Sequence, residues 1–470
     1  MYVFTIPAEN WDETAPDKRA VRHLIIKHRS GLEKLRRLKK YYEGEHDILS
    51  EQGRENRLVC NHAKDISDTA SAYFIGNPIS YKSQEDISAL TEALEDAGAD
   101  EADGDNGLDL SVYGRAYEYI YTKQDETGLV IKNLSPENTF VVYDDSIEWN
   151  ELFAVYYYAR KDDTDRSGTV YVATVLTRNY KYVLNIQDID APQGLLESPE
   201  PHYKGEVPVI EYLNNKLAIG DYELQIPLID AYNALMSDRV TDKEQFVDAI
   251  LAIYGTLLSD GDAEGPEGEK GNGSKNAMKR LREEKLIEMP DAAKAEYLTR
   301  TFDESGVEIL KKAIEQDIHK FSHIPCMSDE SFGGNVSGVA MEFKLLGLEN
   351  ITKIKTRYYR KGLRKRLRIF AQWQQTSRNI VVDVSRVTPT FTRALPKNLL
   401  EISQIVANLW GKVSRKTLLS QIPFVDDPEN ELEVVEQEEK EAARRQKEMF
   451  GIGSNTPPDD DGGEDGDIDE

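Results

Sequence analysis

A change of hydrophobic period in the middle of the chain limits the fold more than any other feature. Between residues 129 and 213, Tyr, Val, Thr and Ile alternate with polar residues in short runs that turn signals separate. This alternation indicates half-buried β-strands, which we expect to pair antiparallel. Before and after this block, apolar residues recur at steps of three and four, as in helices, so the sequence predicts an α+β fold. The expected strands cover residues 140–143, 153–160, 169–177 and 180–186.

Two helices are predicted before the β-rich block. Apolar residues from Val21 to Tyr42 make one face of a single helix, which Gly44 ends. Residues 61–75 make the second helix, because a Gly-Asn-Pro sequence follows and breaks the backbone. The aromatic-rich residues 109–121 fit either a helix or a strand.

Three long helices are predicted after the block. The first covers residues 227–258, about 48 Å at 1.5 Å per residue, and a flexible glycine-rich loop follows it. The second begins at Ser305, whose spacing to Glu308 fits a capping box, and Pro325 ends it. The third runs over residues 339–373.

The end of the chain is expected to be mostly helical. Within the third long helix, the apolar positions change sides after Gly362, which therefore marks a bend or a change of packing partner. Short extended segments are expected at 380–384 and 387–391, and helices at 399–419 and 429–449.

Charge is unevenly distributed along the chain. The net charge of −27 excludes a protein that coats DNA through a uniformly basic surface. Residues 84–110 hold ten acids and no Lys or Arg, whereas residues 18–40 hold ten bases and residues 351–370 hold nine. Residues 456–470 hold eight acids and no base, so we expect a disordered tail that serves as a solubilising extension or an electrostatic contact arm.

Acidic and basic patches on one chain favour contacts between copies of that chain, and such contacts can close into rings. Each charged run also fits a solvated helix face. For the basic face of the third long helix, we favour subunit contact with an acidic surface such as residues 84–110 over direct contact with DNA. The candidate interface residues are Lys353, Arg357, Arg360, Arg364 and Arg368.

Sequence motifs give no positive reason to expect an enzyme, and no cofactor or metal is expected. The glycine-rich residues 261–273 lack the Gly-Lys-Ser/Thr end of a nucleotide-binding loop and fit a flexible loop. His319 and His323 share metal-pair spacing, but a surface or core histidine pair is the favoured interpretation. Cys60 and Cys326 are too few for a disulfide framework or a multi-cysteine zinc site.

The sequence indicates no membrane partner. Its longest apolar-rich stretch is far shorter than the roughly 20 residues that a membrane span needs, and no secretory signal is recognisable. With two cysteines, a reducing intracellular compartment is expected.

Four segments in order resemble motifs of the portal proteins of tailed double-stranded-DNA bacteriophages, in the branch common in long-tailed phages of Gram-positive hosts. The resemblance spans about residues 20–375. The segments are residues 41–48 (YYEGEHDI), 56–79 (with YFIGNPI at its end), 111–118 (SVYGRAYE) and 337–350 (SGVA, then KLLGLEN).

The resemblance implies a ring, typically a dodecamer, at one vertex of the procapsid. Double-stranded DNA would be packaged through its channel by a separate terminase motor and later ejected. The implied partners are other copies of the chain, the terminase large subunit, a head-completion or adaptor protein, and the major capsid and scaffolding proteins. The implied location is the virion, with the host cytoplasm during assembly.

The resemblance also implies a division of the chain into wing, stem, clip, tunnel loop and crown. The implied parts are the wing at 1–226, stem helix 1 at 227–258, the clip at 259–302, stem helix 2 at 303–324, the tunnel loop at 325–338, a long wing helix with following strands at 339–395, the helical crown at 396–450 and the acidic tail at 451–470.

Two of these parts carry candidate site residues. The tunnel loop would face the DNA channel, and the clip would dock the terminase and connector proteins. Candidates in the tunnel loop are Ser331, Phe332, Gly333, Gly334, Asn335, Val336 and Ser337. Candidates in the clip are Lys275, Lys279, Arg280, Arg282, Glu283 and Glu284.

Two other classes of protein remain open from the sequence. One is a phage-encoded nucleic-acid enzyme, such as a nuclease, whose carboxylates bind Mg²⁺. The other is a capsid scaffold or connector that is not a portal. A nuclease should cleave duplex DNA in a metal-dependent manner, whereas a portal should form a hollow ring.

Overall fold

The protein is described from a computed structural model, which divides the chain into two compact units. The larger unit comprises residues 1–336 and 340–394, and the smaller comprises residues 337–339 and 395–470. The structure describes residues 3–123, 128–161, 169–186, 194–196, 199–247, 250–254, 294–298, 304–326, 338–393, 399–422, 425 and 428–449.

The N-terminal helical region contains two helices where the sequence predicted one. Helices α1 (Lys18–Arg29) and α2 (Leu32–Glu43) are separated at Ser30 and Gly31. The Gly31 amide donates a hydrogen bond to the carbonyl of His28 (3.0 Å), which closes a tight turn and ends the α-helical pattern. Gly44 caps α2 at a φ of 87°, as predicted.

Helix α3 (His62–Ile75) agrees with its prediction. The Asn61 side chain accepts a hydrogen bond from the Lys64 amide at 3.0 Å and caps the first turn.

The predicted β-rich block supplies most of a seven-stranded sheet and two strands of a second sheet. The four expected strands are present as β5 to β8 and pair antiparallel, while the short β1 adds to β5 in parallel. Helix α1 covers this sheet with Val21, Leu24 and Ile25. The strands are β1 (Phe4–Ile6), β5 (Thr139–Asp144), β6 (Glu151–Lys161), β7 (Thr169–Leu176), β8 (Tyr180–Ile186), β9 (Gly194–Leu196) and β10 (Glu200–Pro201).

A second sheet of three strands has the order β11 (Val209–Leu213), β3 (Arg115–Thr122), β4 (Leu129–Leu134). The ambiguous residues 109–121 contain both kinds of structure, because helix α5 (Ala99–Tyr113) ends at Gly114 and β3 follows at once. Helix α4 (Ser88–Asp96) precedes α5.

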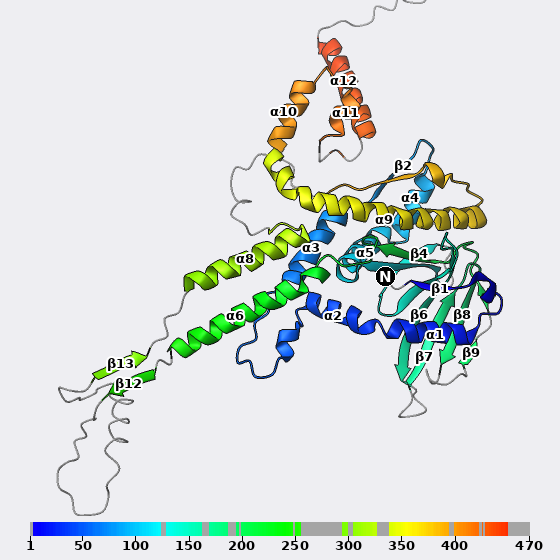
Figure 1. The fold of residues 1–470 in the computed structure, drawn as a ribbon. Coiled ribbons are helices and arrows are strands. Elements are labelled where there is room, and N and C mark those ends of the chain that lie inside the picture. Colours follow the sequence, from blue (N-terminus) through cyan, green and yellow to red (C-terminus); the bar gives the residue numbers. More distant parts are fainter. Residues whose placement is uncertain are drawn as a thin grey trace, which may run out of the picture. The chain divides into compact units, whose positions relative to one another are not determined.

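Helices α6 (Ile226–Val247) and α8 (Glu304–Ser322) lie side by side and run antiparallel (Figure 1). The prediction of one helix over 227–258 is wrong beyond Val247, because Ile250–Tyr254 forms β12 and pairs with β13 (Lys294–Leu298). Ile and Tyr favour strands once a partner strand is present, and cross-strand pairing overrides the helical spacing. Ser305 lies inside α8, so it is not the N-cap that the sequence predicted.

Helix α9 (Gly338–Arg378) is 41 residues long and passes through Gly362 without interruption. A Cβ atom at Gly362 would lie 2.3 Å from Cε1 of Tyr212, so this glycine allows close packing and does not mark a break. Its apolar residues Leu363, Leu367 and Phe370 join the core of α5 and the three-stranded sheet, as Tyr359 before the glycine already does. The change of packing partner at Gly362 therefore stays a prediction.

Short elements complete the larger unit. The predicted extended segment at 387–391 is confirmed as β14 (Thr388–Thr390), which pairs with β2 (Ser80–Lys82), whereas the segment at 380–384 contains no strand. The short 3-10 helices are Ala8–Asn10, Asp47–Ser50, Glu223–Gln225 and Val384–Arg386.

The smaller unit contains α10 (Leu399–Leu409), α11 (Arg415–Leu419) and α12 (Pro428–Met449). The single helix predicted over 399–419 is wrong, because Gly411 adopts a φ of 79° and Ser414 caps a new helix through the Thr417 amide. The prediction for 429–449 is confirmed. None of the helices in the described ranges combines the length and apolar character that a membrane span requires.

Candidate assembly surfaces

The five predicted interface residues form an exposed basic stripe along α9. Their spacing of three and four residues places them on one helix face. The members of the basic stripe are Lys353, Arg357, Arg360, Arg364 and Arg368, and all five are exposed.

Three members of the basic stripe have partners within the chain. The Lys353 ammonium lies 3.7 Å from Glu349, and the Arg368 guanidinium donates a 2.5 Å hydrogen bond to Glu206. The Arg360 guanidinium lies 5.8 Å from the Phe391 ring centroid. Arg357 and Arg364 have no ion-pair partner within the part of the chain that the structure describes.

The opposite side of α9 carries three buried bases that sequence reasoning did not separate from the exposed ones. The Lys355 ammonium pairs with Asp221 at 2.7 Å, and Lys365 pairs with Glu151 and the Val209 carbonyl. The third is Arg366. The sequence does contain a signal for the inward position of two of them. Lys355 and Arg366 each follow a member of the basic stripe by two positions, which places them about 200° further around the helix, on the side away from the stripe.

Arg366 fixes α9 to α5 and β3 through two carboxylates. Its Nη2 donates to Asp103 Oδ1 at 2.6 Å, and its Nε donates to Glu118 Oε1 at 2.9 Å. Burial alone would lower the pKa of Arg366, but the charges of Asp103 and Glu118 raise it well above its usual value. The hydroxyls of Tyr359 and Tyr212 donate to the same two carboxylates, so the charged groups are hydrogen-bonded on several sides. This buried ionic triad sets the rotation of α9 about its axis and keeps the basic stripe outward.

The acidic residues of the 84–110 segment divide into an exposed set and an inward set. Asp103 pairs with Arg366, and burial raises the pKa of Asp109 to about 7. The remaining eight are exposed and form the acidic surface of α4 and α5. Glu85 and Asp86 lie just before α4, and the other six on the two helices are Glu92, Glu95, Asp96, Asp100, Glu101 and Asp105.

The acidic surface and the basic stripe are not neutralised by one another. Of the exposed acids, Glu85 pairs with Arg386. Throughout the described ranges, no ion pair joins a member of the basic stripe to a member of the acidic surface. Two complementary charged surfaces are therefore exposed on the same chain.

The motif at residues 41–48 builds a buried junction between α2, α3 and α6. Nδ1 of His46 accepts a hydrogen bond from Asn233 at 2.8 Å, and Nε2 donates to the Tyr41 carbonyl at 3.0 Å. Burial lowers the pKa of His46, which favours this neutral ring. The Tyr41 hydroxyl donates to Asp230 at 2.7 Å, and the Tyr41 and His46 rings stack 4.5 Å apart. The motif thus anchors the base of α6.

Histidine His319 lies in the core, which agrees with the favoured interpretation of the histidine pair. Its Nδ1 is 3.1 Å from the Ile324 carbonyl, and its ring lies 5.8 Å from that of His62. No group of three or more His, Cys, Asp or Glu residues in the described ranges is arranged to hold a metal ion.

The other predicted sites lie outside the described residues. These are the clip candidates Lys275, Lys279, Arg280, Arg282, Glu283 and Glu284, and the tunnel-loop candidates Ser331 to Ser337. The interval between β12 and β13 contains all of the clip candidates.

A mixed fold with a long helix pair and exposed, complementary charged surfaces fits the class of phage portal proteins. Comparison with known families bears this out. The family model described as "Phage portal protein, SPP1 Gp6-like" matches residues 22–445, so the chain belongs to this family.

Two curated relatives are also named portal proteins, and each matches this chain over most of its length. The portal protein of Bacillus phage SPP1 is 26% identical over 474 residues, covering 97% of this chain and 88% of the relative. The portal protein of Clostridium phage phiCD119 is 22% identical over 470 residues, covering 89% of this chain and 95% of the relative. The chain is therefore a bacteriophage portal protein, a component of the phage head, and the resemblance found in the sequence is confirmed.

Proposed function

We propose that this portal protein closes into a ring, with a dodecamer as the expected form, through contact between the basic stripe of one subunit and the acidic surface of α4 and α5 on the next. A head-to-tail contact between unlike surfaces closes when the rotation between subunits allows it. The observation that carries the proposal is that Arg357 and Arg364 are exposed without an ion-pair partner among the described residues, on a chain that also exposes eight acids in one segment.

Exposed apolar side chains on α8 and the first half of α9 support subunit contacts in the same region. Soluble monomers rarely expose several large apolar side chains close together unless a partner covers them. These side chains are Ile309, Leu310, Phe321, Phe343, Leu346 and Ile354, with exposed fractions of 44 to 73%.

Within this proposal, the ring is the channel through which DNA is packaged and later ejected. A channel must not hold DNA tightly, since each neutralised phosphate adds salt-dependent affinity. The chain has a net charge of −27, and Lys355, Lys365 and Arg366 are buried and so cannot bind phosphates. Both features are compatible with a DNA duplex that slides through the channel.

Within this proposal, each segment of the chain takes the role that the resemblance to portal proteins implies for it. Residues 1–226 and 339–395 would make the wing, α6 and α8 the two stem helices, and α10 to α12 the crown. Residues 259–302 would form the clip that docks the terminase large subunit and a head-completion or adaptor protein. Residues 325–338 would form the tunnel loop at the channel, and capsid and scaffolding proteins would contact the outside of the ring.

The direct test of the ring contact is charge reversal on the basic stripe. The double variant Arg357→Glu/Arg364→Glu should accumulate as monomers or short oligomers by native mass spectrometry and show no hollow rings by negative-stain microscopy. A matched control, Arg19→Glu/Lys27→Glu, makes the same change of charge on exposed positions of α1 and should still form rings. Normal rings from the stripe variant, with altered DNA packaging, would overturn the proposed contact.

The same preparation separates a portal from a nuclease. Parent rings incubated with duplex DNA and Mg²⁺ should leave the DNA intact. Metal-dependent cleavage that disappears when one or two acids are changed would instead favour the enzyme.

A further inference from the structure

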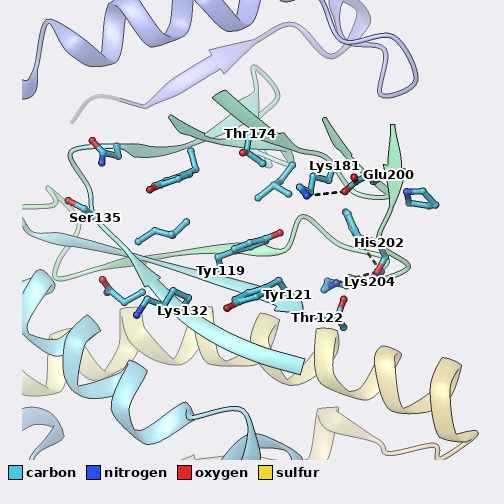
Figure 2. A pocket seen from close by; sticks show the side chains of 16 residues that line it. Tyr119, Tyr121, Thr122, Lys132, Ser135, Thr174, Lys181, Glu200, His202 and Lys204 are labelled. Atoms are coloured by element: carbon cyan, nitrogen blue, oxygen red, sulfur yellow. Dashed lines mark hydrogen bonds and ion pairs between the residues drawn. The ribbon is translucent and has the colours of Figure 1, made fainter. Parts of the chain in front are cut away.

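A cleft lies between the seven-stranded and the three-stranded sheets of the larger unit (Figure 2). Its volume is about 580 Å³, and strands β3, β4, β6, β7 and β8 contribute to its walls. Tyr117 is buried in a cluster with Val141 and Ala154 of the larger sheet and Val209 of the smaller one. Because alternate residues of a strand face the same side, Tyr119 and Tyr121 lie on the same face of β3 as Tyr117, and both line the cleft. Figure 2 shows their rings together inside the cleft.

Lys204 lies in the wall of this cleft and is nearly inaccessible, with 3% of its surface exposed. Its ammonium donates to the His202 carbonyl at 3.3 Å and lies 5.3 Å from the Trp373 ring centroid. No carboxylate of the described residues pairs with it. A buried cation of this kind is costly unless an anion accompanies it.

The other two buried lysines of the described chain show what is missing at Lys204. Lys355 pairs with Asp221 and Lys365 pairs with Glu151. Lys204 is therefore the exception among the three. Burial lowers the pKa of Lys204 to about 8, so the side chain is still mostly protonated at neutral pH.

The rest of the cleft supplies hydrogen-bond donors and a flat surface. The Tyr119 and Tyr121 rings stack 5.2 Å apart, and burial raises the pKa of Tyr119 to about 12, which keeps its hydroxyl as a donor. Lys181 already pairs with Glu200 at 2.9 Å. The His202 ring donates to the Thr177 carbonyl at 3.0 Å and is neutral, since burial lowers its pKa to about 4.

We propose that this cleft binds an oxyanion, a carboxylate or a phosphate group, held by the Lys204 ammonium and flanked by the rings of Tyr119 and Tyr121. The volume is within the range of roughly 300–1,000 Å³ that ligand pockets occupy, so the ligand extends beyond its anionic group. An acidic peptide segment and a small phosphorylated molecule both carry this chemistry. The site is separate from the basic stripe and does not depend on the proposed ring contact.

The first test measures the reactivity of Lys204 in the parent chain, so no variant has to fold. The chain is labelled with acetic anhydride at pH 7, and mass spectrometry compares Lys204 with the exposed Lys216. The probes are inorganic phosphate and a short peptide of glutamates. A bound anion that raises the Lys204 pKa by one unit should slow its labelling about tenfold relative to Lys216.

The second test uses two variants and titration calorimetry with the same probes. Lys204→Met should weaken binding at least about tenfold, which corresponds to loss of one charged contact. Lys181→Met is the matched control, because that ammonium is already paired with Glu200 at the same cleft.

The two probes also distinguish the sources of the anion. Protection by the peptide alone assigns the site to an acidic protein segment, and protection by phosphate alone assigns it to a small phosphorylated molecule. Unchanged Lys204 labelling with both probes would overturn the proposal. So would an equal loss of binding in the two variants, because it would show only general charge attraction.

Discussion

At the scale of single residues, the most informative group is Arg366. Its guanidinium has no exposed surface and faces Asp103 and Glu118, which are also buried. Two carboxylates and one guanidinium leave the triad with a net negative charge in the core. The neighbouring tyrosine hydroxyls donate to these carboxylates and offset part of their desolvation cost.

Removal of the guanidinium should be strongly destabilising. Arg366→Met leaves Asp103 and Glu118 as unpaired buried carboxylates, so we expect the free energy of unfolding to fall by about 3–5 kcal/mol. Urea unfolding followed by circular dichroism measures this change. Arg364→Met, two positions away on the exposed side, should change it by less than about 0.5 kcal/mol. Equal unfolding midpoints for the two variants would contradict the role given to the triad.

At the scale of elements, alternation and helical period located most segments, but tertiary contacts decided their ends. The strands β5 to β8 were predictable because each buries one face and leaves the other polar. The strand β12 was not, since Ile250 and Tyr254 also fit a helical stripe and their partner strand β13 lies some forty residues further along the chain. The break between α1 and α2 depends on one tight turn at Gly31, which leaves the apolar pattern intact.

The charged residues of the candidate surfaces were also predictable only in part. The exposed bases of α9 could be found from their spacing alone. The inward role of Lys355 and Arg366 depends on Asp221, Asp103 and Glu118, which are distant in sequence. The unpaired state of Lys204 was not predictable either, because only the three-dimensional structure shows which carboxylates reach it.

The junction between α5 and β3 gives a prediction at the element scale. Gly114 has a φ of 76°, and a Cβ atom there would lie 2.3 Å from the Ala218 carbonyl oxygen. Gly98 has a similar φ of 75° with open space around it. Gly98→Ala should therefore cost only the conformational strain, about 1–2 kcal/mol. Gly114→Ala should cost about 1–3 kcal/mol more, because the backbone of residues 218–219 must move.

Thermal unfolding of the two alanine variants, compared with the parent chain, checks this difference. Similar losses at both positions would show that the close backbone contact at Gly114 relaxes without cost.

At the scale of the whole molecule, the positions of the charges explain more than the net charge of −27 does. Acids and bases are segregated, and Lys355, Lys365 and Arg366 are neutralised inside the fold. Among the exposed charges are a basic stripe on α9 and an acidic surface on and just before α4 and α5. Such a chain can repel DNA in general and still attract a second copy at one defined place.

A charge-swap experiment tests the pairing of the two surfaces directly. Arg357→Glu/Arg364→Glu and Glu95→Lys/Glu101→Lys should each prevent ring formation, because each places like charges across the subunit contact. The quadruple variant that combines them should recover rings, since every contact again joins opposite charges. Native mass spectrometry counts the subunits in each case. A quadruple variant as defective as either double variant would contradict the pairing.

The antiparallel pair of strands β12 and β13 has a consequence for how such proteins diversify. Tyr254 and Lys294 are direct cross-strand partners, so the two ends of the interval between them lie at adjacent points, about 5 Å apart. The helix pair below them is joined by Arg239 to Glu308 and by Lys243 to Glu304, independently of what lies between the strands. Residues 255–293 can therefore be lengthened, shortened or replaced as one cassette, because loop-closure entropy grows only slowly with length. Under the proposed docking role of these residues, exchange of this cassette would change which proteins the portal recruits, while the rest of the subunit stays the same.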